Sequence, residues 1–121
     1  MIEFKDEVRV VLISSRYSET RQFYEEILNL KVLKDWDHGE GRLGVVYAIG
    51  NTCLEILQGP ARSTSADFYI YIKVEDVDKL WERLQNRVLV EDSIMTQPWG
   101  HRNFSVRDPD GYKLKFFSET A

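Results

Sequence analysis

The sequence predicts an α+β fold built from two βαβββ modules in tandem. Three observations predict it: a repeat at one fixed offset, the same strand and helix order in each half, and one polar linker between the halves. The matched pairs are Leu12–Ile72, Val46–Val106, Leu54–Leu114 and Ile56–Phe116, each 60 residues apart. Repeat arrays usually need three or more units to bury a continuous core, so two copies indicate a duplicated module.

The first half contains an apolar β-branched run at residues 8–14, which predicts a strand. A helix is predicted over 18–29, because its apolar residues recur on one stripe that includes Phe23, Tyr24 and Ile27. Further strands are expected near 31–36, 42–49 and 52–58. These five elements form the first module, at about 6–58.

The second half repeats this order after a small, polar, proline-bearing linker at about 59–66. A strand at 67–74 leads to a helix over 76–86, striped by Leu80, Trp81 and Leu84, and strands follow near 88–92, 102–107 and 112–118. The segment 108–111, Asp-Pro-Asp-Gly, is typical of a type I turn. The second module therefore spans about 67–118, and we expect residues 1–121 to form a single domain.

Composition excludes several classes of protein. The formal charge of −4 and pI near 5.2 argue against a nucleic-acid surface, which needs clustered Lys and Arg. No apolar stretch approaches the roughly 18 residues of a membrane span, and residues 1–7 have no signal-peptide pattern. A single cysteine cannot form an intrachain disulfide bond and is consistent with a reducing compartment. We expect a cytoplasmic protein without nucleic-acid or membrane partners.

Alternation along the strands assigns side chains to two faces of the predicted sheet. One face is almost wholly apolar and should pack against the helices, and its members include Val8, Leu12, Leu54, Phe68 and Phe116. The opposite face mixes charges, phenols and apolar groups. Its members include Arg9, Val45, Tyr47, Glu55, Tyr69, Tyr71, Lys115 and Phe117. Such a face is either the solvated side of an antiparallel sheet or, because its aromatics accompany convergent polar groups, a ligand cleft or subunit contact.

Three segments are the most distinctive of the chain: Phe23-Tyr24 followed by residues 27–30, the opening of the second helix at 74–78, and above all the run from Trp99-Gly100 to Asp110-Gly111. They resemble the vicinal oxygen chelate superfamily, and most closely its glyoxalase and bleomycin-resistance branch. The resemblance covers essentially the whole chain. It implies that the modules form a curved mixed sheet around a cleft, commonly in a homodimer.

Metal-using members of this superfamily place His or Glu near the middle of the first and last strands of each module. The resemblance carries these positions onto Arg9, Glu55, Tyr69 and Lys115. Only Glu55 is an ordinary metal ligand, because the two cations lack a lone pair at neutral pH and the phenol has a pKa near 10. We expect no metal and no other cofactor. We expect Glu55 to lie between Arg9 and Lys115, either as a structural plug or as part of a floor for a ligand.

Three functions follow from these observations. The first is a metal-independent small-molecule binding protein of the antibiotic- or toxin-sequestering kind. The second is a lyase, isomerase or dioxygenase-like enzyme, either metal-independent or metal-dependent, and the third is a dimeric interaction module with a filled cleft. His101 and Trp99 join the candidates as a rim contact and a stacking plate. The predicted ligand-binding residues are Arg9, Tyr47, Glu55, Tyr69, Tyr71, Trp99, His101, Lys115 and Phe117.

Overall fold

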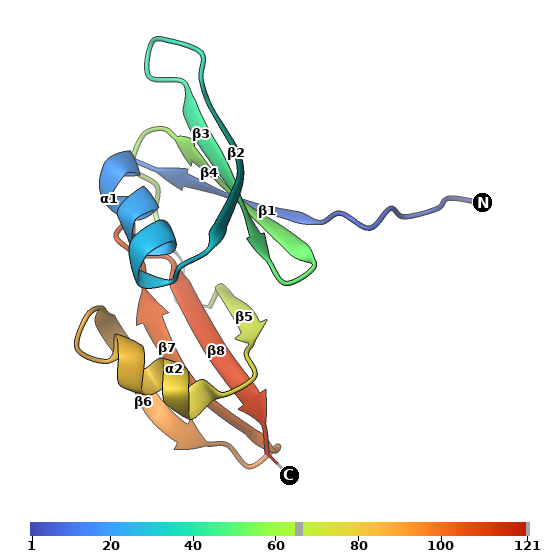
Figure 1. Ribbon diagram of the computed structural model, residues 1–121, viewed down its shortest axis with the longest axis vertical. Helices are drawn as coiled ribbons and strands as arrows, with labels where there is room; N and C mark the ends of the chain where they lie inside the picture. Colours follow the sequence, from blue (N-terminus) through green and yellow to red (C-terminus); the bar gives the residue numbers. More distant parts are fainter. Residues whose placement is uncertain (65–66, 121) are drawn as a thin grey trace. The chain divides into compact units, whose positions relative to one another are not determined.

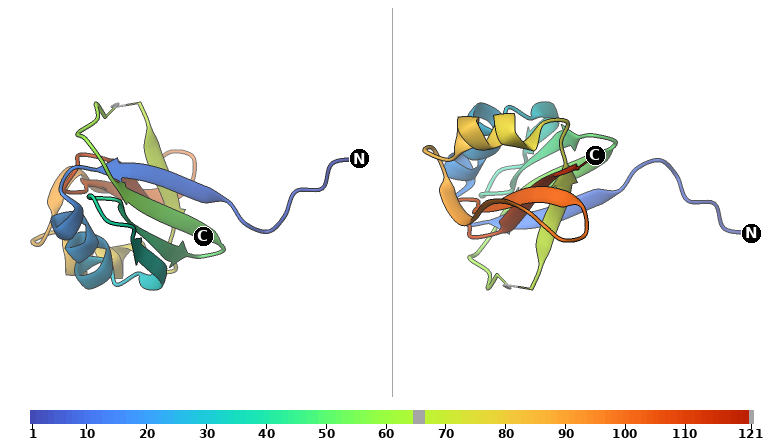
Figure 2. Two further views of the ribbon diagram at one scale, coloured as in Figure 1. Left: turned by 90° about the horizontal axis from the view of Figure 1, so that it is seen from above. Right: turned by 90° about the horizontal axis from the view of Figure 1, so that it is seen from below.

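A computed structural model describes residues 1–64 and 67–120. Its first half, module 1, contains β1 (Arg9–Ser14), α1 (Tyr17–Gln22), η1 (Phe23–Ile27), β2 (Lys31–Asp37), β3 (Leu43–Ile49) and β4 (Thr52–Gln58) (Figure 1). The strands form one sheet in the order β1-β4-β3-β2. β1 pairs with β4 in parallel, and the other two pairings are antiparallel. The segment before β1 extends away from this sheet (Figure 2).

Module 2 repeats the arrangement with β5 (Tyr69–Lys73), α2 (Val77–Leu84), β6 (Leu89–Thr96), β7 (His101–Arg107) and β8 (Lys113–Glu119). Its sheet has the order β5-β8-β7-β6, with β5 and β8 parallel. The prediction of an α+β fold with two tandem βαβββ modules is therefore confirmed. The chain divides into two compact units, residues 1–62 and 63–121. The single domain, the linker at 59–66 and the shared cleft stay predictions.

The helix of module 2 has the start that its sequence predicts. The Asp76 side chain accepts a hydrogen bond from the Lys79 backbone N–H at 3.1 Å, which caps the first turn. Val77 is buried, and Trp81 packs edge-on against Phe104 of β7 with 5.1 Å between ring centroids. This contact fixes which face of the β5–β8 sheet the helix covers.

The helix predicted over 18–29 in module 1 has two parts. After α1 the chain widens into a π-helical turn, in which the Leu28 N–H bonds the Phe23 carbonyl at 3.0 Å. Phe23 and Tyr24, adjacent in sequence, are both buried. The π-helical turn ends at Ile27, and Asn29, two residues later, has a left-handed φ of 59°. No helix among residues 1–64 and 67–120 has the length and apolar character to cross a membrane.

The apolar faces carry the cores that alternation predicts. Leu54, Ile56, Leu114 and Phe116 are each at most 3% exposed. Burial of each such side chain stabilises the fold by about 1.5–3 kcal/mol. Two residues assigned to these faces are mostly exposed, Val8 at 63% and Phe68 at 52%. They precede β1 and β5, so neither the sheet nor a helix covers them.

The repeat offset is 60 residues between β1 and β5 and between β4 and β8, and it is 59 between β3 and β7. β1 pairs Val11 with Glu55, and β5 pairs Tyr71 with Lys115, which preserves the predicted offset. In the next strand Val46 lies opposite Glu55, whereas Ser105 lies opposite Lys115. The predicted match of Val46 with Val106 is therefore wrong by one residue. The reason is that the turn from β7 to β8, counted from the pair Ser105–Lys115, contains one residue more than the turn from β3 to β4, counted from the pair Val46–Glu55.

Candidate functional site

The predicted site residues of module 1 form an ion-paired group on the sheet face opposite the helix. Arg9 Nη1 donates to Glu55 Oε1 at 2.8 Å, as the sequence predicted, and Arg9 Nε donates to Glu7 at 2.8 Å, which it did not. The hydrogen bonds to Glu55 and then to Glu7 raise the pKa of Arg9 above its ordinary value. The Glu55 side chain is 13% exposed. Arg9 thus has carboxylates on two sides. Their negative charges offset the charge of the guanidinium, which leaves little positive charge to attract a ligand.

Module 2 places two lysines against Tyr69. The Nζ atoms of Lys113 and Lys115 each lie 5.5 Å from the centroid of the phenol ring. Lys113 also forms ion pairs with Glu91 and Asp92, at 3.0 and 3.1 Å. Lys115 makes no ion pair within module 2 as described, so it supplies the positive charge of this face.

The four positions that the superfamily resemblance assigns to a metal do not fit one here. The Glu55 carboxylate already accepts a guanidinium hydrogen bond, and the Lys115 ammonium lies over Tyr69. Two of the four side chains are cations without a lone pair. Among residues 1–64 and 67–120, no group of three His, Cys, Asp or Glu side chains is arranged to hold a metal ion.

Three ring side chains of module 2 stack together on the face opposite α2. Phe117 lies 4.2 Å from Tyr71 and 4.4 Å from His101 between centroids, at interplanar angles of 13° and 17°. The centroids of Tyr71 and His101 are 5.7 Å apart. If the Phe117 ring lay between the other two rings, the Tyr71 and His101 centroids would be two stacking distances apart, which is about 7 Å or more. Tyr71 and His101 therefore lie side by side over the same face of Phe117.

A directed chain of hydrogen bonds connects this stack to the interior. Gln97 Nε2 donates to Asn103 Oδ1 at 3.1 Å, and Asn103 Nδ2 donates to the Tyr71 hydroxyl oxygen at 3.1 Å. The Tyr71 hydroxyl lies 2.8 Å from His101 Nδ1. Asn103 is 1% exposed, so its amide has its partners inside the protein. Asn103 and Gln97 were not among the predicted site residues, although alternation places Asn103 on the same strand face as His101.

Tyr47 lies on the other side of its sheet from the one predicted. It pairs with Leu54 and is fully buried on the helix side, where its hydroxyl donates to Glu25 Oε2 at 2.7 Å. Val45, paired with Ile56, shares this correction. The one-residue difference between the two turns is the physical reason, since a shift of one reverses the face of every side chain on a strand. Tyr47 is removed from the ligand-binding set.

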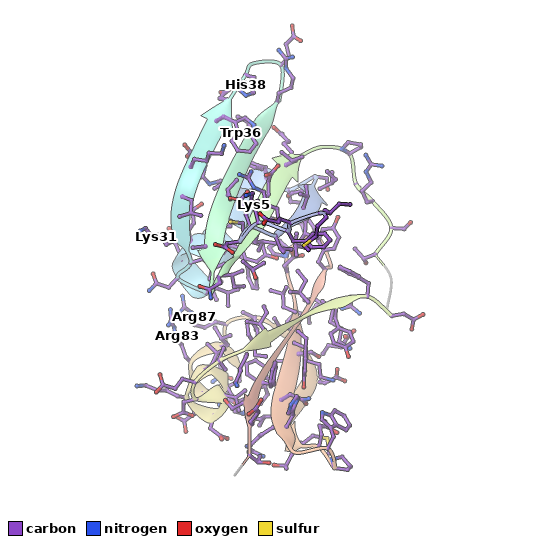
Figure 3. All side chains as sticks on the ribbon, turned by 90° about the vertical axis from the view of Figure 1, so that its right-hand side faces the viewer. Lys5, Lys31, Trp36, His38, Arg83 and Arg87 are labelled. Carbon is purple, nitrogen blue, oxygen red and sulfur yellow. The ribbon has the colours of Figure 1, made fainter. Side chains whose placement is uncertain are left out.

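The tryptophans occupy separate positions. Trp99 is 62% exposed in the turn between β6 and β7. Trp36 lies toward the tip of the β2–β3 hairpin with His38, which stacks on it at 6.3 Å (Figure 3). Its ring covers Gly44, where an added Cβ would stand 2.1 Å from Trp36 Cζ2. Any larger residue at position 44 would therefore collide with the Trp36 ring.

Five of the predicted residues come together, with Asn103, within a single module. We call this group the module 2 polar face, and it consists of Tyr69, Tyr71, His101, Asn103, Lys115 and Phe117. All six lie on the sheet face opposite α2, since register pairs Tyr71 with Lys115 and Asn103 with Phe117. Tyr69 and Tyr71 are 43% and 37% exposed. This face combines stacking surfaces, hydrogen-bond donors and one cation, which are the components of a small-molecule site.

Comparisons with known proteins agree with the fold and the sequence resemblance. The model of the Glyoxalase/Bleomycin resistance protein/Dioxygenase superfamily matches residues 8–116. YwbC, an uncharacterized protein of Bacillus subtilis (strain 168), is 27% identical over an alignment of 105 positions, and the match covers 78% of this chain and 82% of YwbC.

Two solved structures share the fold at low sequence identity. The fosfomycin resistance protein FosX of Listeria monocytogenes has a TM-score of 0.79 at 18% identity, with 99% of this chain and 96% of FosX covered. TnmS3, an antibiotic binding protein from Streptomyces sp. CB03234, has a TM-score of 0.74 at 24% identity, with 98% of each chain covered.

Proposed function

Because the chain belongs to the glyoxalase/bleomycin resistance protein/dioxygenase superfamily, we propose that it binds a small aromatic molecule without a metal, in the manner of an antibiotic- or toxin-sequestering protein. The observation that carries the proposal is the stack of Tyr71 and His101 on Phe117, on a strand face with exposed phenols. The antibiotic-binding TnmS3 and the fosfomycin resistance protein FosX share its fold, which supports this choice within the family.

The charges of the module 2 polar face favour an anionic ligand. Within this module as described, Lys115 forms no salt bridge, although its charge acts on Asp92 at longer range, whereas Lys113 forms two. In module 1, Glu7 and Glu55 occupy the guanidinium of Arg9. A ligand carboxylate or phenolate would therefore bind at Lys115, where a charge-assisted hydrogen bond is stronger than a neutral one.

An acid–base enzyme is the second candidate, and one contact favours it. The Tyr71 hydroxyl and His101 Nδ1, 2.8 Å apart, form a donor and acceptor pair of the type used in proton transfer. The two candidates differ in the fate of the ligand: a binding protein returns it unchanged after prolonged incubation, whereas an enzyme yields product.

A charge series on one ring system tests the binding proposal. The probes are 2-naphthoate, 2-naphthamide and 2-naphthylmethylammonium, titrated against the full chain by calorimetry. We expect 2-naphthoate to bind most tightly and Lys115→Met to weaken it about tenfold, the equivalent of about 1.4 kcal/mol. Lys79→Met on α2, at the opposite face of the sheet, is the matched control and should leave binding unchanged.

Two results would contradict the proposal. Failure of all three probes to bind would remove aromatic recognition. Equal effects of the two lysine substitutions would remove the assignment of Lys115 as the anchor. The homodimer and the cytoplasmic location remain separate predictions, which sedimentation and cell fractionation test.

A further inference from the structure

We propose that Tyr71 and His101 act as one composite plate that selects ligands with two or more fused planar rings, and that His101 Nε2–H at its edge donates to an oxygen of the ligand. This inference rests on the proposed function and adds to it the shape and acceptor chemistry of the ligand.

The plate follows from the ring positions. Tyr71 reaches across from β5 and His101 from β7, and both cover Phe117 of the intervening strand β8. Their centroids are 5.7 Å apart, their planes differ by 29°, and a hydrogen bond joins their edges. Since Phe117 backs both rings on one side, their outer faces form one wide surface. A single ring overlaps one member of the pair, whereas a fused ring system overlaps both.

The hydrogen-bond chain decides where the imidazole proton lies. The Tyr71 oxygen accepts from Asn103 Nδ2, whose orientation is fixed because Gln97 donates to the other end of that amide. The Tyr71 proton is then directed to His101 Nδ1 at 2.8 Å. A neutral imidazole that accepts at Nδ1 carries its proton at Nε2. His101 therefore presents a donor at Nε2, and Gln97 and Asn103 are its positioning residues.

These two features define a ligand class. It is a fused aromatic system, with an acceptor oxygen such as a carbonyl, carboxylate or phenolate at the edge that meets His101. A ligand that carries only donors at this edge would leave the imidazole N–H unpaired, which costs binding free energy.

The ring-size test compares benzoate with 2-naphthoate on the full chain. A larger ring gains affinity on any apolar surface, so the informative quantity is the ratio of the two affinities in each variant. We expect His101→Ala to weaken 2-naphthoate about fivefold more than benzoate, because it removes the surface on which the second ring of the naphthalene stacks. His101→Phe restores a flat ring and should restore the ratio. Lys79→Met on α2, at the opposite face of the sheet, should leave the ratio unchanged.

The second measurement is the tautomer itself, read from long-range ¹⁵N–¹H spectra of histidine-labelled protein without ligand. We expect the Nε2–H form of His101 in the wild type and in Lys79→Met, and a mixture of the two tautomers in Tyr71→Phe, which lacks the directing hydroxyl. An Nδ1–H form in the wild type would overturn the assigned donor.

Failure of the composite plate can be distinguished from failure of the proposed function. If the probes bind but His101→Ala preserves the affinity ratio, the composite plate is wrong and the proposed function stands. If no probe binds the wild type, the proposed function and the ligand class fall together, whatever the spectra show.

Discussion

Replacement of Tyr47 by Phe removes one hydroxyl from a buried network in module 1. The hydroxyl donates to Glu25 Oε2 at 2.7 Å, and Arg21 Nε donates to the same oxygen at 2.6 Å. The ring stays packed against Tyr24, 5.7 Å away between centroids. A hydrogen bond to a charged group contributes about 1.5–3 kcal/mol. Because Arg21 still holds the carboxylate, we expect a loss at the lower end, about 1.5 kcal/mol.

Urea denaturation at neutral pH, followed by circular dichroism, measures this loss. With an m-value of about 1–3 kcal/mol/M, the midpoint should fall by about 0.5–1.5 M at unchanged slope. Tyr69→Phe is the matched control, since its 43% exposed ring loses the same atom at the surface and should change stability by less than about 0.5 kcal/mol. Equal effects of the two substitutions would refute the reasoning.

The pH dependence of the same pair gives an independent check. Burial acts to raise the pKa of Glu25, but the hydrogen bonds from Arg21 and then Tyr47 outweigh it, so the pKa lies below its ordinary value. A carboxylate with a lowered folded pKa contributes its stability above the unfolded pKa, about 4.3, and loses it as pH falls through the folded pKa. The difference between wild type and Tyr47→Phe should therefore be constant from about pH 6 to 8 and shrink in acid.

Three further outcomes are expected. Gly44→Ala should displace Trp36, because its Cβ would stand 2.1 Å from Cζ2, with a stability loss of about 1–3 kcal/mol and a red-shifted tryptophan emission; unchanged emission would contradict the contact. Addition of Mn²⁺, Ni²⁺ or Zn²⁺ to metal-free protein should leave Tm unchanged, whereas marked stabilisation would show a site that the donor set does not support. Hydrogen bonding from Arg107 and then Lys113 lowers the pKa of Glu91, so Glu91→Gln should lose stability at pH 7 and show a flatter decline below about pH 4; an acid limb as steep as wild type would contradict this.

Strand alternation was sufficient to place most of the polar face. Along β5 and β8 it put Tyr71, Lys115 and Phe117 on one side, and the register confirms this placement. It failed at Tyr47, because the face of an inner strand depends on the length of the turn that precedes its partner. The sequence pattern shows where a turn lies, but only the pairing of the two strands shows how many residues of the turn remain unpaired.

The π-helical turn likewise could not be predicted from the spacing of apolar residues. Phe23 and Tyr24 fit an ordinary helical stripe, and only the hydrogen bond from Leu28 to Phe23 reveals the wider turn. Burial of both aromatic residues and the contact between Glu25 and Tyr47 accompany it.

The duplicated α+β plan, the apolar faces and the chemical identity of the residues at the four positions used for metals can be derived from the amino-acid order, because they depend on residue type and spacing along the chain. Which side chains meet depends on how the strands pair and pack. The hydrogen-bonded plate of Tyr71 and His101 over Phe117 brings together three strands, and its proton is directed by the buried amide of Asn103. Stacking and hydrogen-bond direction are set by distances of a few ångströms between segments remote in sequence, and no local pattern encodes those distances.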